Sequence, residues 1–317
     1  MDLHTTPDLY VSLGPVGDLD RLRPRIERLD ALGVEGVLLP DHLFFAPGGD
    51  RADAFRTNDP IVVLGAIAAM SGRLRLGTLV ANVGIAHPAL ILRHFAQLAG
   101  LVGGERVLAG IGAGWNTEEF DALGIDMPPH GARLDRLEEA CRLARALFDD
   151  GIAAIDGDHV VTRDLPVAPR FGVAPKLLLG GGSDRLLEIA GRYADHVDLN
   201  GSSRRRPLGR ALPLFDDGPR RHATTVADLV DSAARVRSVA EVAGRPHPAL
   251  SVVIDTLTVG REPDPSLTDC PYVLGGDPAR IAAAAAERVE RIGLQALVLP
   301  ESPDSPGLEV VIQALRA

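Results

Sequence analysis

Lysine is almost absent from this sequence of 317 residues: Lys176 is the only one, and arginine supplies every other basic side chain. Acidic residues outnumber basic ones by 43 to 33, which gives a net charge of −10 with histidine neutral. Nucleic acids and anionic membranes attract basic surfaces, so this balance argues against both as partners. Aromatic residues make up only 4% of the chain, and we therefore expect a core built from Leu, Val, Ile and Ala.

The sequence also lacks the signals of several other protein classes. Its two cysteines, Cys141 and Cys270, form no CxxC pair, which fits reduced thiols and a cytoplasmic location. It has no HExxH motif, cysteine cluster or spaced carboxylate set, so no metal site is expected. A GxSxG nucleophile motif is missing too. The N-terminus has no signal-peptide pattern and no apolar stretch reaches membrane-spanning length.

Short apolar runs alternate with segments of helical period along the whole chain. We expect strands at 9–13, 36–40, 74–81, 106–114, 176–180, 196–200, 250–259 and 294–300. Near-continuous apolar runs are typical of parallel strands that are covered on both faces. Eight such βα units predict the α/β class and a closed (β/α)8 TIM barrel. A doubly wound open sheet is the main alternative, but it usually places GxGxxG after its first strand, where this chain has LGPVGD.

No break in composition divides the chain, so residues 1–317 are expected to form a single barrel domain. Two segments rich in proline and polar residues, 201–223 and 260–276, are predicted to be inserted loops over the mouth of the barrel. The length of the first suggests a lid.

The active site of such a barrel is built from loops at the carboxyl ends of the strands. Asp41 and His42 directly follow the second predicted strand, which places an acid and an imidazole at the barrel mouth. Histidine is the usual proton donor or acceptor near neutral pH. The alternative is that Asp41 caps a turn and His42 is an ordinary surface residue.

Two glycine-rich turns follow other strands. Glycines in GIGAGWN (110–116) would let a ligand approach the backbone closely, although a tight βα turn needs them too. The second turn, Gly180–Ser183, leads directly into a helix, whose free N–H groups and dipole favour an anion such as phosphate. The alternative there is a flexible loop with Ser183 as a plain helix cap.

Five segments of the chain resemble one known family. They are LLPDHLF, LGTLVANVGIAHPAL, GGERVLAGIGAGWNTEEFDALGIDMPPHGARLDRLEEA, LLLGGGSDRLLEIAGRYADHV and PYVLGGDPARIAAAAAERVERIGLQALVLP. They are spread over nearly the whole chain, from residue 38 to residue 300, and the third is the most specific. The chain resembles the luciferase-like monooxygenases, and within them the branch that uses the deazaflavin coenzyme F420.

The resemblance implies a flavin-like ring in the barrel mouth, with His42 as the candidate catalytic residue. It implies a non-prolyl cis peptide at Leu79–Val80, and a homodimer, since dimers are common in the family. The residues it implies for cofactor binding are Asp41, Thr78, Leu79, Val80, Ala81, Asn82, Gly112, Gly114, Asn116, Gly180, Gly181, Gly182 and Ser183. The expected substrate wall consists of Phe44, Phe45 and Trp115.

The sequence departs from the sugar-phosphate dehydrogenases of the F420-dependent branch that it resembles. Trp115 stands where those enzymes have an acid, and a single lysine cannot form a phosphate-binding cluster. We therefore expect hydride transfer between F420 and an apolar organic substrate. One alternative is an FMN-dependent monooxygenase that uses O2, and another is a protein that binds F420 or a flavin without catalysis.

Overall fold

The computed structural model describes residues 6–45, 55–56, 58–166, 172–201, 222–301 and 307–317. Within them, eight parallel strands form a barrel: β1 (Asp8–Leu13), β2 (Gly36–Leu39), β5 (Arg75–Thr78), β7 (Val107–Gly112), β10 (Lys176–Gly181), β11 (His196–Leu199), β12 (Ala249–Val253) and β15 (Ala296–Glu301). Each strand pairs with the next in this order, and pairing of β15 with β1 closes the ring. This confirms the predicted (β/α)8 barrel.

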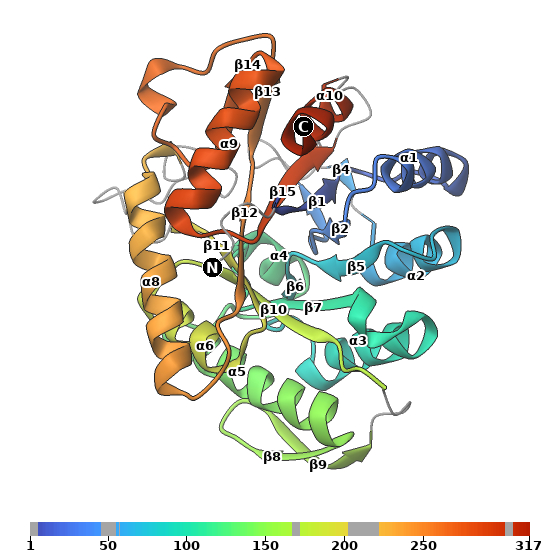
Figure 1. Ribbon diagram of the computed structural model, residues 1–317. Helices are drawn as coiled ribbons and strands as arrows, with labels where there is room; N and C mark the ends of the chain where they lie inside the picture. Colours follow the sequence, from blue (N-terminus) through green and yellow to red (C-terminus); the bar gives the residue numbers. More distant parts are fainter. Residues whose placement is uncertain (1–5, 46–54, 57, 167–171, 202–221, 302–306) are drawn as a thin grey trace.

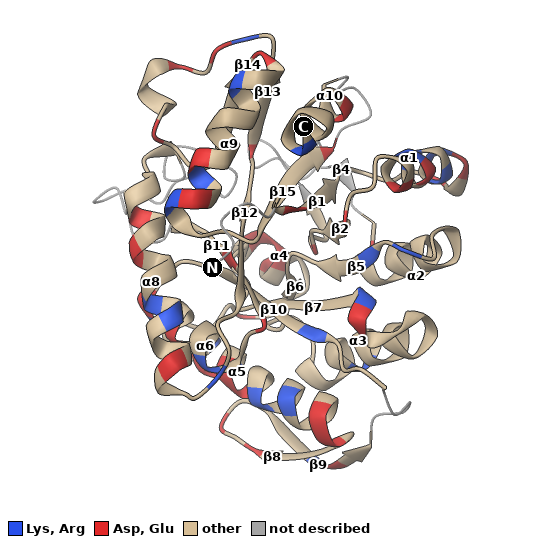
Figure 2. Cartoon of the chain, in the orientation of Figure 1, with Lys and Arg blue, Asp and Glu red and all other residues tan. Residues whose placement is uncertain are grey.

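The described α-helices are α1 (Leu19–Ala31), α2 (Pro60–Met70), α3 (Pro88–Val102), α4 (Thr117–Ala122), α5 (His130–Arg145), α6 (Asp184–Tyr193), α8 (Val226–Val242), α9 (Pro278–Ile292) and α10 (Leu308–Arg316). They surround the strands on the outside of the barrel, except the short α4, which lies within the ring of strands in this view (Figure 1). Aspartate caps start several of them: Asp18 accepts a hydrogen bond from the N–H of Arg21, and Asp59 precedes Pro60 at the start of α2. Charged residues gather on α1, α5, α8 and α9, whereas α2 has none (Figure 2).

Apolar side chains fill the inside of the barrel. The buried interior cluster consists of Tyr10, Leu38, Leu108, Leu178, Ala296 and Val298. Alternate residues of the same strands point outward and form a second, larger core with the helices. Three partly buried residues, Leu79, Val80 and Val253, pack against the interior cluster and follow or end their strands. They therefore form an apolar floor at the carboxyl end of the barrel.

The third predicted strand is interrupted. It was expected to run through 74–81, but β5 ends at Thr78 and the Leu79–Val80 peptide bond is cis, as the resemblance implied. The chain resumes as β6 (Ala81–Asn82), which pairs with β7 through Ala81 and Ile111. The predicted continuous strand is therefore wrong at these two residues, whose side chains pack against the interior cluster.

The seventh predicted strand, 250–259, is also wrong in its second half. Strand β12 ends at Val253, and β13 (Thr256–Val259) forms a separate parallel pair with β14 (Val273–Gly276). The segment 260–276, expected to be a loop, thus contributes a strand and a short 3-10 helix at Pro265–Leu267. An apolar run alone cannot distinguish this half-exposed strand from a core strand. The 201–223 loop lies almost entirely outside the described residues.

The remaining elements are short. A hairpin of β8 (Ile152–Asp156) and β9 (Val161–Pro166) packs beside α5 and turns after Asp156. Strands β3 (Phe44–Phe45) and β4 (Phe55–Arg56) pair antiparallel after β2. A 3-10 turn covers Gly104–Arg106, and α5 ends in a π-helical turn at Ala146–Asp150. In the described part of the chain, no helix is both long and apolar enough to cross a lipid bilayer.

Candidate active site

Asp41 connects two of the loops at the carboxyl end of the barrel. It follows β2, and its Oδ2 accepts a hydrogen bond of 3.0 Å from the backbone N–H of Asn82 in β6. Burial raises the pKa of the Asp41 carboxyl above its ordinary value, and the bond from Asn82 opposes part of that rise. A carboxylate held in a partly dry opening is typical of a functional site.

His42 is held by an acid that the sequence analysis did not identify. Its Nδ1 lies 3.0 Å from Oε1 of Glu119, which also accepts the backbone N–H of Leu43 at 2.8 Å. The Glu119 side chain is 2% exposed and that of His42 is 16% exposed. Glu119 belongs to α4, after β7, so this contact joins the second and fourth βα loops. The only sequence signal was an acidic pair, Glu118-Glu119, three residues after Trp115.

Apolar side chains lie beside His42. The rings of His42 and Trp115 meet edge to face, with centroids 5.5 Å apart and planes at 75°. Trp115 is 47% exposed and Leu43 is 43% exposed, which is high for such large apolar groups. Phe44 is half-buried in β3, and Phe45 follows it in the same strand. The structure thus brings Trp115 to His42, as the proposed substrate wall requires.

Two glycines keep the floor of the opening low. A Cβ atom on Gly112 would come within 2.4 Å of the Val80 side chain, and one on Gly180 would lie 3.3 Å from Val80 and 3.5 Å from Leu79. Since Val80 packs on the interior cluster beneath it, any side chain at Gly180 would stand above the floor. A flat ring could lie here against Leu79 and Val80.

Thr78 and Ala81 flank the cis peptide and are buried. The Thr78 hydroxyl donates a 2.6 Å hydrogen bond to the carbonyl oxygen of Gly110. Gly110 must be glycine because a Cβ there would lie 1.8 Å from the Thr78 carbonyl oxygen. These contacts attach β5 to β7 directly below the opening.

Asn82 and Asn116 are also buried, at 8% and 1% exposure. The side-chain oxygen of Asn82 accepts the N–H of Gly84, and that of Asn116 caps α4 by accepting the N–H of Glu118. Gly114 has a φ of +74° and lies against Asn82, where a Cβ would clash. These residues therefore shape the turns around the opening from within.

The Gly180–Ser183 turn joins β10 to α6. Gly181 has a φ of +150°, and a Cβ on Gly182 would lie 1.6 Å from the carbonyl oxygen of Asn200 at the end of β11. The Ser183 hydroxyl caps α6 by accepting the N–H of Leu186 at 3.3 Å. The turn is therefore tightly packed at Gly182 and begins a helix after Ser183. An anion site at this helix N-terminus stays a prediction.

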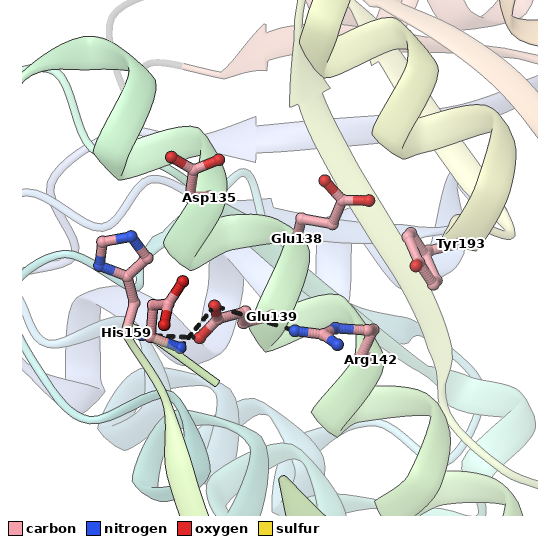
Figure 3. Close-up of a pocket in the computed structure, with 7 residues that line it drawn as sticks. Asp135, Glu138, Glu139, Arg142, His159 and Tyr193 are labelled. Atoms are coloured by element: carbon pink, nitrogen blue, oxygen red, sulfur yellow. Dashed lines mark hydrogen bonds and ion pairs between the residues drawn. The ribbon is translucent and has the colours of Figure 1, made fainter. Parts of the chain in front are cut away.

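A hollow of about 360 Å³ lies elsewhere, between α5, α6 and the β8–β9 hairpin (Figure 3). It is lined by Asp135, Glu138, Glu139, Arg142, Asp158, His159 and Tyr193. Glu139 accepts the backbone N–H groups of Asp158, His159 and Val160 at 2.7–3.0 Å, so it attaches the hairpin to the helix. This hollow contains none of the predicted site residues. No group of metal-binding side chains was found anywhere in the described ranges.

Two curated relatives share part of the sequence. The F420-dependent glucose-6-phosphate dehydrogenase of Beutenbergia cavernae is 31% identical over 201 residues, which are 62% of this chain and 57% of that protein. The phthiodiolone/phenolphthiodiolone dimycocerosates ketoreductase of Mycobacterium sp. (strain JLS) is 37% identical over 153 residues, 46% of this chain and 38% of the ketoreductase. The chain thus aligns with little more than half the length of the first relative.

A solved structure shares the fold over its full length. An F420-dependent secondary alcohol dehydrogenase, in complex with an F420-acetone adduct, superposes with a TM-score of 0.77 at 16% identity. The match covers 99% of this chain and 100% of that one. The model of the luciferase-like monooxygenase family matches residues 3–267. This chain therefore belongs to the luciferase-like monooxygenase family.

Proposed function

We propose that the protein is an oxidoreductase that transfers a hydride between coenzyme F420 and an apolar organic substrate of the alcohol or carbonyl class. The observation that carries this proposal is the position of His42, held by Glu119 and Trp115 at the opening above Leu79 and Val80. The relatives named as F420-dependent dehydrogenases support the choice of cofactor.

The residues at the opening suit a flat ring with an anionic tail. Leu79, Val80 and the bare backbone of Gly180 offer a flat apolar surface, and Asp41 supplies a hydrogen-bond acceptor at its edge. The N-terminus of α6 after Ser183 would hold the phosphate of the tail. Coenzyme F420, when bound, supplies the hydride donor or acceptor, and the protein supplies position, charge and exclusion of water.

His42 is the residue that we assign to proton transfer. Oxidation of an alcohol to a carbonyl releases a hydride and the hydroxyl proton, and a neutral imidazole can accept that proton. In the reverse direction the imidazolium donates it to the carbonyl oxygen that becomes the hydroxyl. The edge contact with Trp115 limits rotation of the ring and keeps one side of it dry.

The substrate is proposed to be apolar because of what surrounds His42. Trp115 and Leu43 expose large apolar surfaces there. Lys176 begins β10 and therefore lies at the amino end of the barrel, where it cannot bind a sugar phosphate at the mouth. The guanidinium of Arg133 donates to the carbonyl oxygens of Gly114 and Pro128, so it serves the loop instead.

Cofactor binding tests the proposal first. The purified protein is titrated with F420 and separately with FMN, and we expect F420 to bind at least about tenfold more tightly. Tight binding of FMN with oxygen consumption would instead establish a flavin-dependent monooxygenase, an activity for which the family is named. Turnover is then measured as the change in F420 absorbance with a panel of apolar secondary alcohols and ketones, with glucose 6-phosphate for comparison.

The variant His42→Ala separates catalysis from binding. Loss of a general acid–base group lowers kcat by about 10²- to 10⁴-fold, while the affinity for F420 should stay within a few-fold of the original. Leu101→Ala is the matched control, since Leu101 on α3 is 81% exposed and is none of the site residues. Unchanged turnover in His42→Ala would remove His42 from the mechanism and favour a protein that only binds the cofactor.

A further inference from the structure

We infer that Glu119 is a positioning residue that fixes the tautomer of His42, so that His42 exchanges its proton through Nε2. The inference rests on the proposed function only for the use made of that proton. The tautomer itself follows from contacts within this chain. Glu119 was not among the residues that the sequence or the resemblance indicated.

A single oxygen of Glu119 organises the whole His42 segment. Its Oε1 lies 3.0 Å from Nδ1 of His42 and accepts the backbone N–H of Leu43 at 2.8 Å. The side chain and the main chain of two successive residues therefore converge on one acceptor. The direction of the imidazole ring and the path of the loop after β2 are set together, and neither can move without breaking a bond to the same atom.

The chemistry of a carboxylate decides which ring nitrogen carries the hydrogen. An ionised carboxylate only accepts hydrogen bonds, and a neutral imidazole has one donor nitrogen and one acceptor nitrogen. Since the carboxylate has no hydrogen to donate, Nδ1 of His42 must be the donor in this pair, and Oε1 accepts from it and from the Leu43 N–H. Nε2 is then the basic nitrogen of the neutral ring, which can take a proton from an alcohol.

The burial of Glu119 supports a role that the fold alone does not require. Its side chain is 2% exposed, and an ionised carboxylate is costly to bury unless hydrogen bonds compensate. Both of its hydrogen bonds described above go to residues 42 and 43 rather than to the helix or the barrel. Glu119 sits on α4, whose start is fixed by the buried cap Asn116, so the carboxylate approaches His42 from a rigid position.

The test measures the tautomer directly, without cofactor. The protein is labelled with ¹⁵N-histidine, and the ring nitrogens are observed by NMR at about pH 8.5, where histidine side chains are ordinarily neutral. His42→Ala identifies the signals of His42 by their loss. We expect Nδ1 of His42 to be protonated and Nε2 to be unprotonated in the original protein. The opposite tautomer, or an even mixture, would overturn the inference.

Two substitutions at Glu119 separate positioning from simple packing. Glu119→Gln keeps an oxygen that can accept from both partners, so the tautomer should persist and kcat should stay within about threefold. Glu119→Leu fills the same space without an acceptor, so His42 should populate both tautomers and kcat should fall by about 10². Asp121→Leu removes an exposed carboxylate from the same helix and should change neither the His42 tautomer nor kcat.

The outcomes separate this inference from the proposed function. An unchanged His42 tautomer in folded Glu119→Leu would mean that Glu119 only packs the loop, whatever the cofactor. If Glu119→Leu does not fold, the tautomer in the original protein and in Glu119→Gln decides the question. Failure of the protein to bind F420 would overturn the proposed function, while the NMR result would still establish or refute the role of Glu119.

Discussion

The carboxylate of Asp41, which follows β2, accepts the backbone N–H of Asn82, the last residue of β6, at 3.0 Å. This bond closes the loop after the cis peptide onto the segment that carries His42. It also explains why an acid that burial makes costly to ionise is placed there. The hydrogen bond offsets part of the cost of ionising this carboxyl, and a ligand that donates a hydrogen bond to it would offset more.

Asp41→Asn should stabilise the protein and weaken cofactor binding. The raised pKa means that the folded state holds the Asp41 proton more tightly than the unfolded state does. Stability is therefore lost as the pH rises from the ordinary carboxyl pKa through the raised one, and the loss persists at neutral pH. Asparagine has no charge to bury and its carbonyl can still accept the Asn82 N–H.

We expect the Tm of Asp41→Asn at neutral pH to rise by a few degrees and the Kd for F420 to increase about tenfold, which is about 1.4 kcal/mol. Thermal denaturation and F420 titration measure the two effects. Asp30→Asn is the control, because Asp30 ends α1 and pairs with Arg73 at the opposite end of the barrel. It should leave the Kd unchanged. A Kd unaffected by Asp41→Asn would exclude Asp41 from the cofactor site.

Alanine substitution at Gly180 should weaken cofactor binding, whereas alanine substitution at Gly182 should destabilise the fold. In Gly180→Ala, the new Cβ meets only the ends of Val80 and Leu79 at 3.3 Å or more, so the protein should fold with little loss of stability. The methyl would stand above the floor of the opening and should raise the Kd for F420 about tenfold or more. F420 titration against the original protein measures this.

Gly182→Ala provides the contrast. Its Cβ would fall 1.6 Å from a backbone oxygen of Asn200, which cannot move without distorting β11. We expect the free energy of unfolding to drop by about 3 kcal/mol or more, visible in urea denaturation. If Gly180→Ala binds F420 as tightly as the original protein does, the ring does not lie over Leu79 and Val80.

Trp115→Ala should weaken substrate binding without affecting the cofactor. The indole is nearly half exposed and meets His42 edge to face, so its removal deletes apolar contact area for the substrate. Loss of such contact changes kcat/KM by about 10- to 100-fold, and we expect most of it in KM for the most apolar substrates. Trp115→Phe should retain most of the activity. An equal loss for polar and apolar substrates would show that Trp115 acts only on His42.

The barrel could be predicted from the sequence because its strands are short apolar runs between helical segments, such as GVLLP before Asp41. The main error in the predicted elements lies at 254–276, because an apolar run does not indicate which sheet a strand will join. Strand β13 (TLTV) follows closely after the apolar β12, yet it pairs with β14 across a proline-rich segment. Pairing of the half-exposed β13 with the buried β14 leaves no local pattern in the sequence.

The candidate site also contains contacts between residues far apart in the chain, which local sequence patterns do not predict. His42 could be placed at the opening because it follows a strand directly, and Ser183 at a helix start because glycines precede it. The contact of Glu119 with His42 could not be predicted, since it joins residues 77 positions apart in the chain. The cis bond at Leu79–Val80 came from the resemblance alone, because the residues around it have nothing in composition that distinguishes them from an ordinary strand.

His196 should make the fold sensitive to acid. It lies inside the barrel with 4% exposure, its ring 6.1 Å from that of Tyr10, and burial lowers its pKa to about 4. Within the described residues, its Nε2 has no hydrogen-bond partner. The unfolded chain therefore binds a proton near the ordinary histidine pKa of about 6.5, while the folded protein resists it until about pH 4.

The contribution of neutral His196 to the free energy of unfolding is accordingly full above about pH 6.5. It decreases by about 3 kcal/mol at most as the pH falls toward 4. His196→Phe keeps the ring against Tyr10 and removes the proton site, so its unfolding free energy should change less over this window. Urea denaturation at a series of pH values measures the difference. His94→Phe, on the exposed face of α3, is the matched control and should keep the original pH dependence. Parallel curves for His196→Phe and the original protein would assign the acid sensitivity to other groups.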